Sequence, residues 1–75
     1  MLSFYSWMQE KYVLKDGRYK NNRFGDLASD MANDPCFPRD SHDREALENY
    51  FSLIPNNEAY IAAKDALKKY IKSVV

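Results

Sequence analysis

Cysteine, histidine and glycine are scarce in this chain of 75 residues, and its charges cancel. The single cysteine excludes an intramolecular disulfide, and a lone thiol is typical of a reducing cytoplasm. The two glycines, Gly17 and Gly25, do not have the spacing of a phosphate-binding loop. Eleven basic and eleven acidic residues give a formal net charge of zero, which excludes a polybasic chain that coats nucleic acid by charge alone.

Long hydrophobic runs are missing as well. No stretch approaches the roughly 20 apolar residues that a helix needs to span a bilayer. The first ten residues contain neither a basic leader nor the apolar run of a signal peptide. A length of 75 residues excludes a two-domain enzyme. We therefore expect a single helical domain over residues 1–75, with no membrane segment and a cytoplasmic location.

Aromatic side chains, by contrast, make up 15% of the chain. A domain this short buries only about 60–65% of the surface that its unfolded chain exposes, so its core depends on a few large side chains. Each aromatic side chain can bury roughly 150–250 Å². We therefore expect most of the aromatic residues to lie in the core.

Apolar residues repeat at helical spacing in the first half of the chain. A first helix is predicted over residues 3–12, with Ser3 as its N-cap, and a second over residues 23–33. Turn-forming residues separate them over positions 14–22. Pro35 ends the second helix, because the residue before a proline avoids the helical conformation. The two apolar stripes consist of Phe4, Trp7 and Met8, and of Phe24, Leu27, Ala28 and Met31.

The second half of the chain predicts two more helices after a short connector. The two prolines within residues 35–39 predict a stiff, extended segment. The third helix stops at Pro55, and the fourth runs towards the C-terminus. The possible caps are Asp40 or Ser41 for the third helix and Asn56 or Asn57 for the fourth. Their apolar stripes are Leu47, Tyr50, Phe51 and Ile54, and then Tyr60, Ala63, Leu67, Tyr70 and Val74, supported by Ile61 and Ile71. No strand-like alternation competes, so the fold is predicted to be all-α.

Charge is unevenly distributed although its sum is zero. Residues 1–23 carry a net charge of +3, residues 26–48 carry −5, and residues 58–75 carry +2. The middle of the chain is therefore acidic and both ends are basic. This segregation favours head-to-tail pairing with a partner protein or a second copy. Whether the two basic ends meet on one surface depends on the fold.

Several short motifs follow one another in an order that resembles a known family. Residues 3–8 read Ser-Phe-Tyr-Ser-Trp-Met, residues 23–28 read Arg-Phe-Gly-Asp-Leu-Ala, and residues 34–38 read Asp-Pro-Cys-Phe-Pro. Asp43 follows, and then a Glu-Asn-Tyr-Phe turn at residues 48–51. This order is similar to that of the YozE-like family of small bacterial proteins.

The resemblance covers roughly residues 3–54, about two thirds of the chain. It implies a compact orthogonal bundle of four helices, or five with a short turn, similar to the sterile alpha motif (SAM) fold. The function of the family is uncharacterised, so the resemblance brings no catalytic or binding residues. The chain departs from the family's pattern at residues 14–19, which replace a Pro/Lys-rich connector, and in its more basic final helix.

Cys36 and His42 are the residues most able to act chemically. Cys36 lies between two prolines, and a reactive thiol there would need nearby cations or a helix N-terminus to activate it. The simpler interpretation is a small apolar residue packed under the connector. His42 is flanked by aspartates, with Asp30 and Asp34 on the second helix, but zinc and calcium patterns are missing and capping explains the acidic residues. We therefore expect no catalytic residue, no metal and no cofactor.

Lysines recur every four residues on the fourth helix, and further basic residues occupy the first loop. A basic helical stripe of this kind could follow a phosphate backbone, so nucleic-acid binding is the alternative function. The simpler interpretation is a solvated outer face, since the helix dipole favours lysines near a C-terminus. The candidate nucleic-acid-binding residues are Lys64, Lys68, Lys69, Lys72, Lys15, Arg18, Lys20 and Arg23, with Lys11 beside them.

Complete packing signals and the lack of a catalytic constellation favour a binding role over an enzymatic one. We expect a non-enzymatic helical module that binds another macromolecule. A protein partner or a second copy is favoured over nucleic acid, because the net charge of zero leaves only a local basic patch. No small-molecule substrate and no membrane binding are evident, and the partner's identity is unknown.

Overall fold

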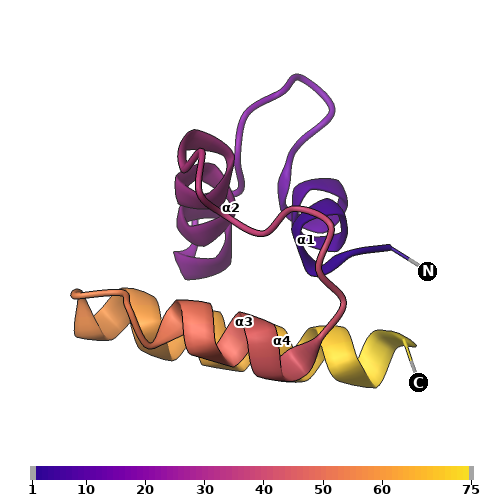
Figure 1. The fold of residues 1–75 in the computed structure, drawn as a ribbon. Helices are drawn as coiled ribbons and strands as arrows, with labels where there is room; N and C mark the ends of the chain where they lie inside the picture. Colours follow the sequence, from indigo (N-terminus) through magenta and orange to yellow (C-terminus); the bar gives the residue numbers. More distant parts are fainter. Residues whose placement is uncertain (1, 75) are drawn as a thin grey trace.

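The four helices form two crossing layers (Figure 1). The computed structural model describes residues 2–74, without the side chain of Val74. The helices are α1 (Phe4–Tyr12), α2 (Arg23–Asn33), α3 (Arg44–Phe51) and α4 (Asn57–Val74). α3 and α4 lie side by side, and α1 and α2 cross them on one face. The predicted all-α bundle of four helices is confirmed.

The first two helices begin where the sequence predicts. Ser3 caps α1, and its Oγ accepts a hydrogen bond of 3.2 Å from the N–H of Ser6. Asn22 caps α2, and its side chain accepts a hydrogen bond of 2.8 Å from the N–H of Gly25. Each cap satisfies a backbone donor that the first helical turn leaves unpaired.

The loop between α1 and α2 folds back on itself as a short hairpin. Val13 and Tyr19 form an isolated antiparallel bridge. Gly17 lies at the turn between them with a φ of +89°, a backbone conformation that residues other than glycine rarely adopt. The loop then passes the first turn of α2, where a Cβ on Gly25 would lie 1.8 Å from the carbonyl oxygen of Lys20. Gly25 therefore has a packing role, because its lack of a Cβ lets the loop backbone approach the first turn of α2.

The connector between α2 and α3 was predicted to be extended, and this prediction is wrong. It folds into two tight turns. The N–H of Phe37 donates to the Asp34 carbonyl (3.2 Å), and the N–H of Ser41 donates to the Pro38 carbonyl (3.2 Å). The fixed φ of proline fits both a turn and an extended chain. The two prolines therefore could not show which of these two conformations the connector adopts. The turns direct the ring of Phe37 into the core, where it is buried.

The third helix is shorter at both ends than predicted. Its N-cap is Asp43 rather than Asp40 or Ser41, because the Ser41 Oγ accepts a hydrogen bond from the Asp43 N–H and holds this segment in a turn. The helix ends at Phe51, so Ile54 lies beyond it. The N–H of Ile54 donates to the Phe51 carbonyl (3.0 Å) in the turn that follows.

The fourth helix carries the apolar stripe predicted for it, with one exception. Asn56 acts as its cap, since its Oδ1 accepts a hydrogen bond of 3.1 Å from the N–H of Ala59. Ile61, which was expected to support the stripe, is 45% exposed. The side chain of Val74 lies outside the described residues. No helix described between residues 2 and 74 is long and apolar enough to cross a membrane. The buried residues of α4 are Ala62, Ala63, Ala66, Leu67 and Tyr70.

The core is built around the ring of Phe4, which is fully buried. Four other rings have centroids between 5.5 and 6.4 Å from it, those of Trp7, Phe37, Phe51 and Tyr70. These rings belong to α1, the connector, α3 and α4, so a single side chain joins most of the fold. The Tyr70 hydroxyl also donates to the Leu2 carbonyl (2.6 Å), which ties α4 to the N-terminal segment.

Candidate functional site

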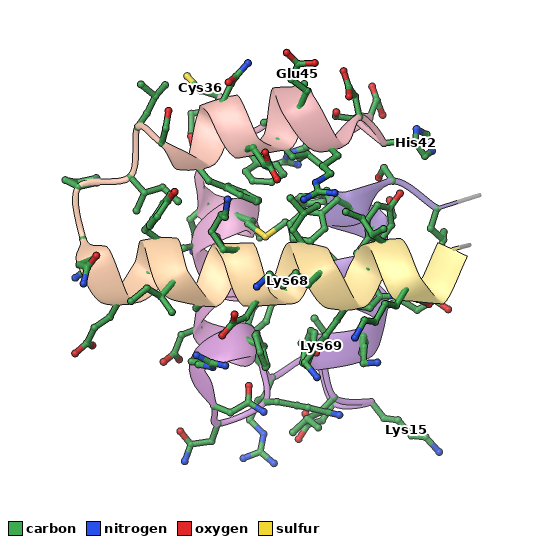
Figure 2. The ribbon with its side chains drawn as sticks, turned by 90° about the horizontal axis from the view of Figure 1, so that it is seen from below. Lys15, Cys36, His42, Glu45, Lys68 and Lys69 are labelled. Carbon is green, nitrogen blue, oxygen red and sulfur yellow. The ribbon has the colours of Figure 1, made fainter. Side chains whose placement is uncertain are left out.

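The chain's single cysteine and single histidine lie far apart. Figure 2 shows Cys36 and His42 at opposite ends of α3. The prediction that Cys36 packs under the connector is wrong, because the turn directs Phe37 inwards and leaves Cys36 exposed. A cysteine nucleophile needs a base within hydrogen-bond reach, and these two residues do not form such a pair.

Acidic residues do not gather into a metal site. Among the described residues, no three side chains of His, Cys, Asp or Glu lie where they could hold a metal ion together. The dense aspartates instead act in caps and turns. The Asp43 side chain accepts from the Glu45 N–H (3.1 Å), and the Asp34 side chain accepts from the Cys36 N–H (2.9 Å).

The two basic ends of the chain meet beside Phe24. The guanidinium of Arg23 lies 4.8 Å from the centroid of the Phe24 ring, and the Nζ of Lys69 lies 5.8 Å from it. Arg23 also forms an ion pair of 2.7 Å with Asp65 of α4. The fold therefore brings the first loop and the last helix together, which the sequence left open.

Further cations lie over the rings next to Phe24. The Tyr12 centroid is 5.4 Å from that of Phe24, and the Trp7 centroid is 6.2 Å from that of Tyr12. The Nζ of Lys20 lies 5.7 Å from the Tyr12 centroid, and the Nζ of Lys11 lies 5.1 Å from the Trp7 centroid. Each ring attracts the cation above it. We call the following four residues the basic surface: Lys11, Lys20, Arg23 and Lys69.

Lys64 and Lys68 lie on the other side of α4, beside α3. The Lys64 Nζ is 3.9 Å from Glu48 Oε1, which also accepts a hydrogen bond of 2.9 Å from Arg44 Nε. That hydrogen bond, together with the positive charges of Lys64 and Arg44, holds the pKa of the Glu48 carboxyl below its usual value. Figure 2 shows Lys68 on the outer side of α4 and Lys69 towards the first loop. The lysines of this helix therefore divide between two sides.

The remaining candidate residues contribute less to the basic surface. The Arg18 Nε lies 2.7 Å from Asp16 Oδ2, which offsets its charge. Figure 2 shows Lys15 pointing away from α4. Lys72 is exposed in the last turn of α4, where the helix dipole favours a positive charge.

A groove with an apolar floor runs past α2 and the α3–α4 loop. It consists of three hollows of about 190, 120 and 350 Å³, and neighbouring hollows share lining residues. Leu27 lines the first two, and Tyr50 and Ile54 line the last two. Leu53 lines the third and is 76% exposed. An exposed leucine beside a partly buried tyrosine and isoleucine leaves apolar surface in contact with water.

Carboxylates line the same groove. The Tyr50 hydroxyl donates to Asp34 Oδ2, which fixes one of them beside the apolar floor. Arg23 is the one cation among the described lining residues, and it is paired with Asp65. We call this feature the acidic groove, with the floor residues Leu27, Tyr50 and Ile54, the exposed Leu53 at its edge, and the carboxylates Asp26, Asp30, Asp34 and Glu58.

The sequence interpretation missed this groove. It assigned Ile54 to a helical stripe and considered Asp30 and Asp34 only as unlikely metal ligands. One signal was present in the apolar pair of Leu53 and Ile54 directly before Pro55. Leu53 falls outside the predicted stripe of Leu47, Tyr50, Phe51 and Ile54, so helical spacing gave it no place in the core.

Comparison with known proteins supports the fold. No curated protein and no solved structure was found to match the chain. The family model described as YozE SAM-like fold matches residues 3–72, which extends the resemblance of residues 3–54 through most of α4. The predicted SAM-like fold is thus confirmed together with the family. The chain belongs to the YozE SAM-like fold family.

Proposed function

We propose that this chain is a non-enzymatic, cytoplasmic module that binds another protein through the acidic groove. The observation that carries the proposal is the position of Leu53, which is 76% exposed beside the groove floor. Apolar surface rimmed by charged groups is typical of a protein-binding site. A partner that covers Leu53 together with the apolar side chains of the groove would remove this surface from water, which favours binding.

The groove defines the chemistry of its partner. Its carboxylates attract lysine or arginine, and its floor accepts an apolar side chain. The aliphatic stem of a lysine covers apolar surface while its ammonium group reaches a carboxylate. The partner is therefore a protein surface that presents an apolar side chain flanked by basic residues.

Two features support the other parts of the proposal. Cys36 and His42 lie at opposite ends of α3, so the chain's only thiol and only imidazole do not act together as nucleophile and base (Figure 2). The Cys36 thiol is free and exposed, which suits a reducing compartment such as the cytoplasm.

Photo-crosslinking in living cells tests the groove directly. A photoreactive amino acid in place of Leu53 should capture a partner protein, and the same residue in place of Ile61 should not. Ile61 is the matched control because it is an exposed apolar residue of α4 that does not line the groove. The captured protein, once purified, should bind the wild-type chain at least about tenfold more tightly than the Asp30→Lys variant. Equal capture at both positions, or equal binding by both chains, would refute the groove as the docking site.

Nucleic-acid binding is a second candidate, and the convergence of the basic ends favours it. Lys20, Arg23 and Lys69 come from both ends of the chain and lie on one side of the fold. A cluster of this kind attracts a phosphate backbone. Trp7 and Tyr12 are buried, so their rings are not available to stack on bases and the contacts would be to phosphate.

A mobility-shift assay decides this second candidate. Duplex DNA at about 50 mM salt should be retarded by the wild-type chain, with an affinity that falls steeply as salt is added. Lys69→Glu should abolish the shift, whereas Lys68→Glu, on the outer side of α4, should weaken it far less. No shift at about 50 mM salt, or equal loss in the two variants, would remove nucleic-acid binding through this surface.

A further inference from the structure

Among the described residues, the carboxylates of the acidic groove form no ion pair with a cation of the same chain. The ion pairs among the described residues join Arg18 to Asp16, Arg23 to Asp65, and Arg44 and Lys64 to Glu48. None of them uses a carboxylate of the acidic groove. The four groove carboxylates therefore lie outside these ion pairs, and the two surfaces adjoin at Arg23, which lines the first hollow of the groove and pairs with Asp65.

We propose that the acidic groove of one copy binds the basic surface of a second copy, so that chains associate head to tail. This inference rests on the proposed function, because it names the protein that occupies the groove. Charge complementarity is the main argument: residues 1–23 carry a net charge of +3, and residues 26–48 carry −5. The first segment supplies most of the basic surface, and the second supplies most of the groove carboxylates.

The apolar parts of the two surfaces also correspond. Leu14 is 40% exposed on the first loop, directly before Lys15. It gives the first loop, which also carries Lys20 of the basic surface, an exposed apolar side chain next to a lysine, and this is the chemistry that the groove accepts. In a head-to-tail pair, Leu14 of one copy packs beside Leu53 of the other, and lysines of the first copy face Asp30 and Asp34.

The geometry of such a contact predicts how it grows. The two surfaces are different, so the contact is heterologous, and each bound copy leaves one groove and one basic surface open. Association therefore continues into chains or closes into a ring, and it does not stop at a symmetric dimer. Because charges drive it, added salt weakens it.

Sedimentation velocity over a range of protein concentrations tests the inference. The wild-type chain should form species that grow with concentration at about 20 mM salt and dissociate at about 500 mM. Asp30→Lys in the groove and Lys69→Glu on the basic surface should each weaken association by at least about tenfold. Glu45→Lys and Lys68→Glu are the matched controls, because they make the same charge changes at positions that Figure 2 shows on the outer sides of α3 and α4.

Mixing the two surface variants gives the sharpest readout. The Asp30→Lys chain keeps its basic surface, and the Lys69→Glu chain keeps its groove, so a mixture should form dimers and stop there. A misfolded variant would not regain binding on mixing, so the mixture also controls for folding. The inference would be overturned by a wild-type chain that stays monomeric at low salt or by a mixture that stays monomeric. It would also be overturned if the control variants lost as much association as the two surface variants. If the chain is monomeric while position 53 still captures a different protein in cells, the proposed function stands and only the second copy is excluded.

Discussion

The guanidinium of Arg23 and the carboxylate of Asp65 lie 2.7 Å apart, although 42 positions separate them in the chain. Their side chains are 55% and 36% exposed, so water and salt screen the attraction. We expect a double-mutant cycle with Arg23→Gln and Asp65→Asn to give a coupling energy of at most about 1 kcal/mol in urea unfolding. The pair thus orients the basic surface on α4 without adding much to stability.

The salt dependence of the coupling energy distinguishes the exposed pair of Arg23 and Asp65 from a buried ion pair. The coupling energy should shrink when salt is raised from about 50 mM to about 500 mM. The Arg44 and Glu48 pair, which is also partly exposed, provides the matched control and should respond in the same way. A coupling energy above about 3 kcal/mol at high salt, the size lost when buried pairs are broken, would contradict the prediction.

Gly25→Ala tests whether the first loop lies against α2. Alanine normally stabilises a helix interior by about 0.5–1 kcal/mol relative to glycine. Here its Cβ would meet the carbonyl oxygen of Lys20 at 1.8 Å, so the loop backbone has to move. We therefore expect destabilisation by about 1–3 kcal/mol, measured as a lower urea midpoint. The direction of the change in the urea midpoint decides between the two cases. A higher midpoint in Gly25→Ala would show that nothing lies against this face of α2.

The sequence predicted α1 and α2 accurately because their signals are local. Ser3 and Asn22 satisfy donors within three residues, and the apolar stripes follow directly. The start of α3 was not predictable in the same way, since Asp40, Ser41 and Asp43 are all good caps. The choice depends on the turns that bury Phe37, which is a tertiary effect.

The candidate surfaces depend even more on tertiary structure. Helical periodicity places Lys68 and Lys69 about 100° apart around α4, but only the packed fold shows which of them lies near the first loop. The acidic groove forms because α2 lies beside the α3–α4 loop, and no local pattern encodes that contact. Charge segregation along the sequence predicted an acidic middle and basic ends, and Lys20, Arg23 and Lys69 were already among the candidate residues. Only the fold shows that these three lie together and that Asp30 and Asp34 line a groove.

Leu67→Ala and Leu53→Ala compare a core leucine with a groove leucine. Leu67 is 2% exposed and Leu53 is 76% exposed. We expect Leu67→Ala to cost about 3 kcal/mol or more in urea unfolding, and Trp7→Ala to cost a similar amount, because both leave cavities in the core. Leu53→Ala should change stability by less than about 0.5 kcal/mol and still weaken partner binding. Equal loss of stability in the two leucine variants would show that Leu53 has a packing role instead.

Tyr70 makes stability sensitive to alkaline pH. Burial raises the pKa of the Tyr70 phenol above its ordinary value of 10.0, and the same cause raises the pKa of Tyr12. As pH rises through about 10, the unfolded chain therefore loses these protons before the folded chain does. The free energy of unfolding then falls with rising pH. Well below pH 10 both phenols are protonated in both states, and they have no effect on the pH dependence of stability. Urea midpoints measured between about pH 8 and pH 11 should show this fall, and Tyr70→Phe should make it shallower. Tyr70→Phe also loses the hydrogen bond to the Leu2 carbonyl, which should cost about 1 kcal/mol at pH 8. A variant with the wild-type pH dependence would show that the Tyr70 phenol ionises equally easily in the folded and unfolded chains.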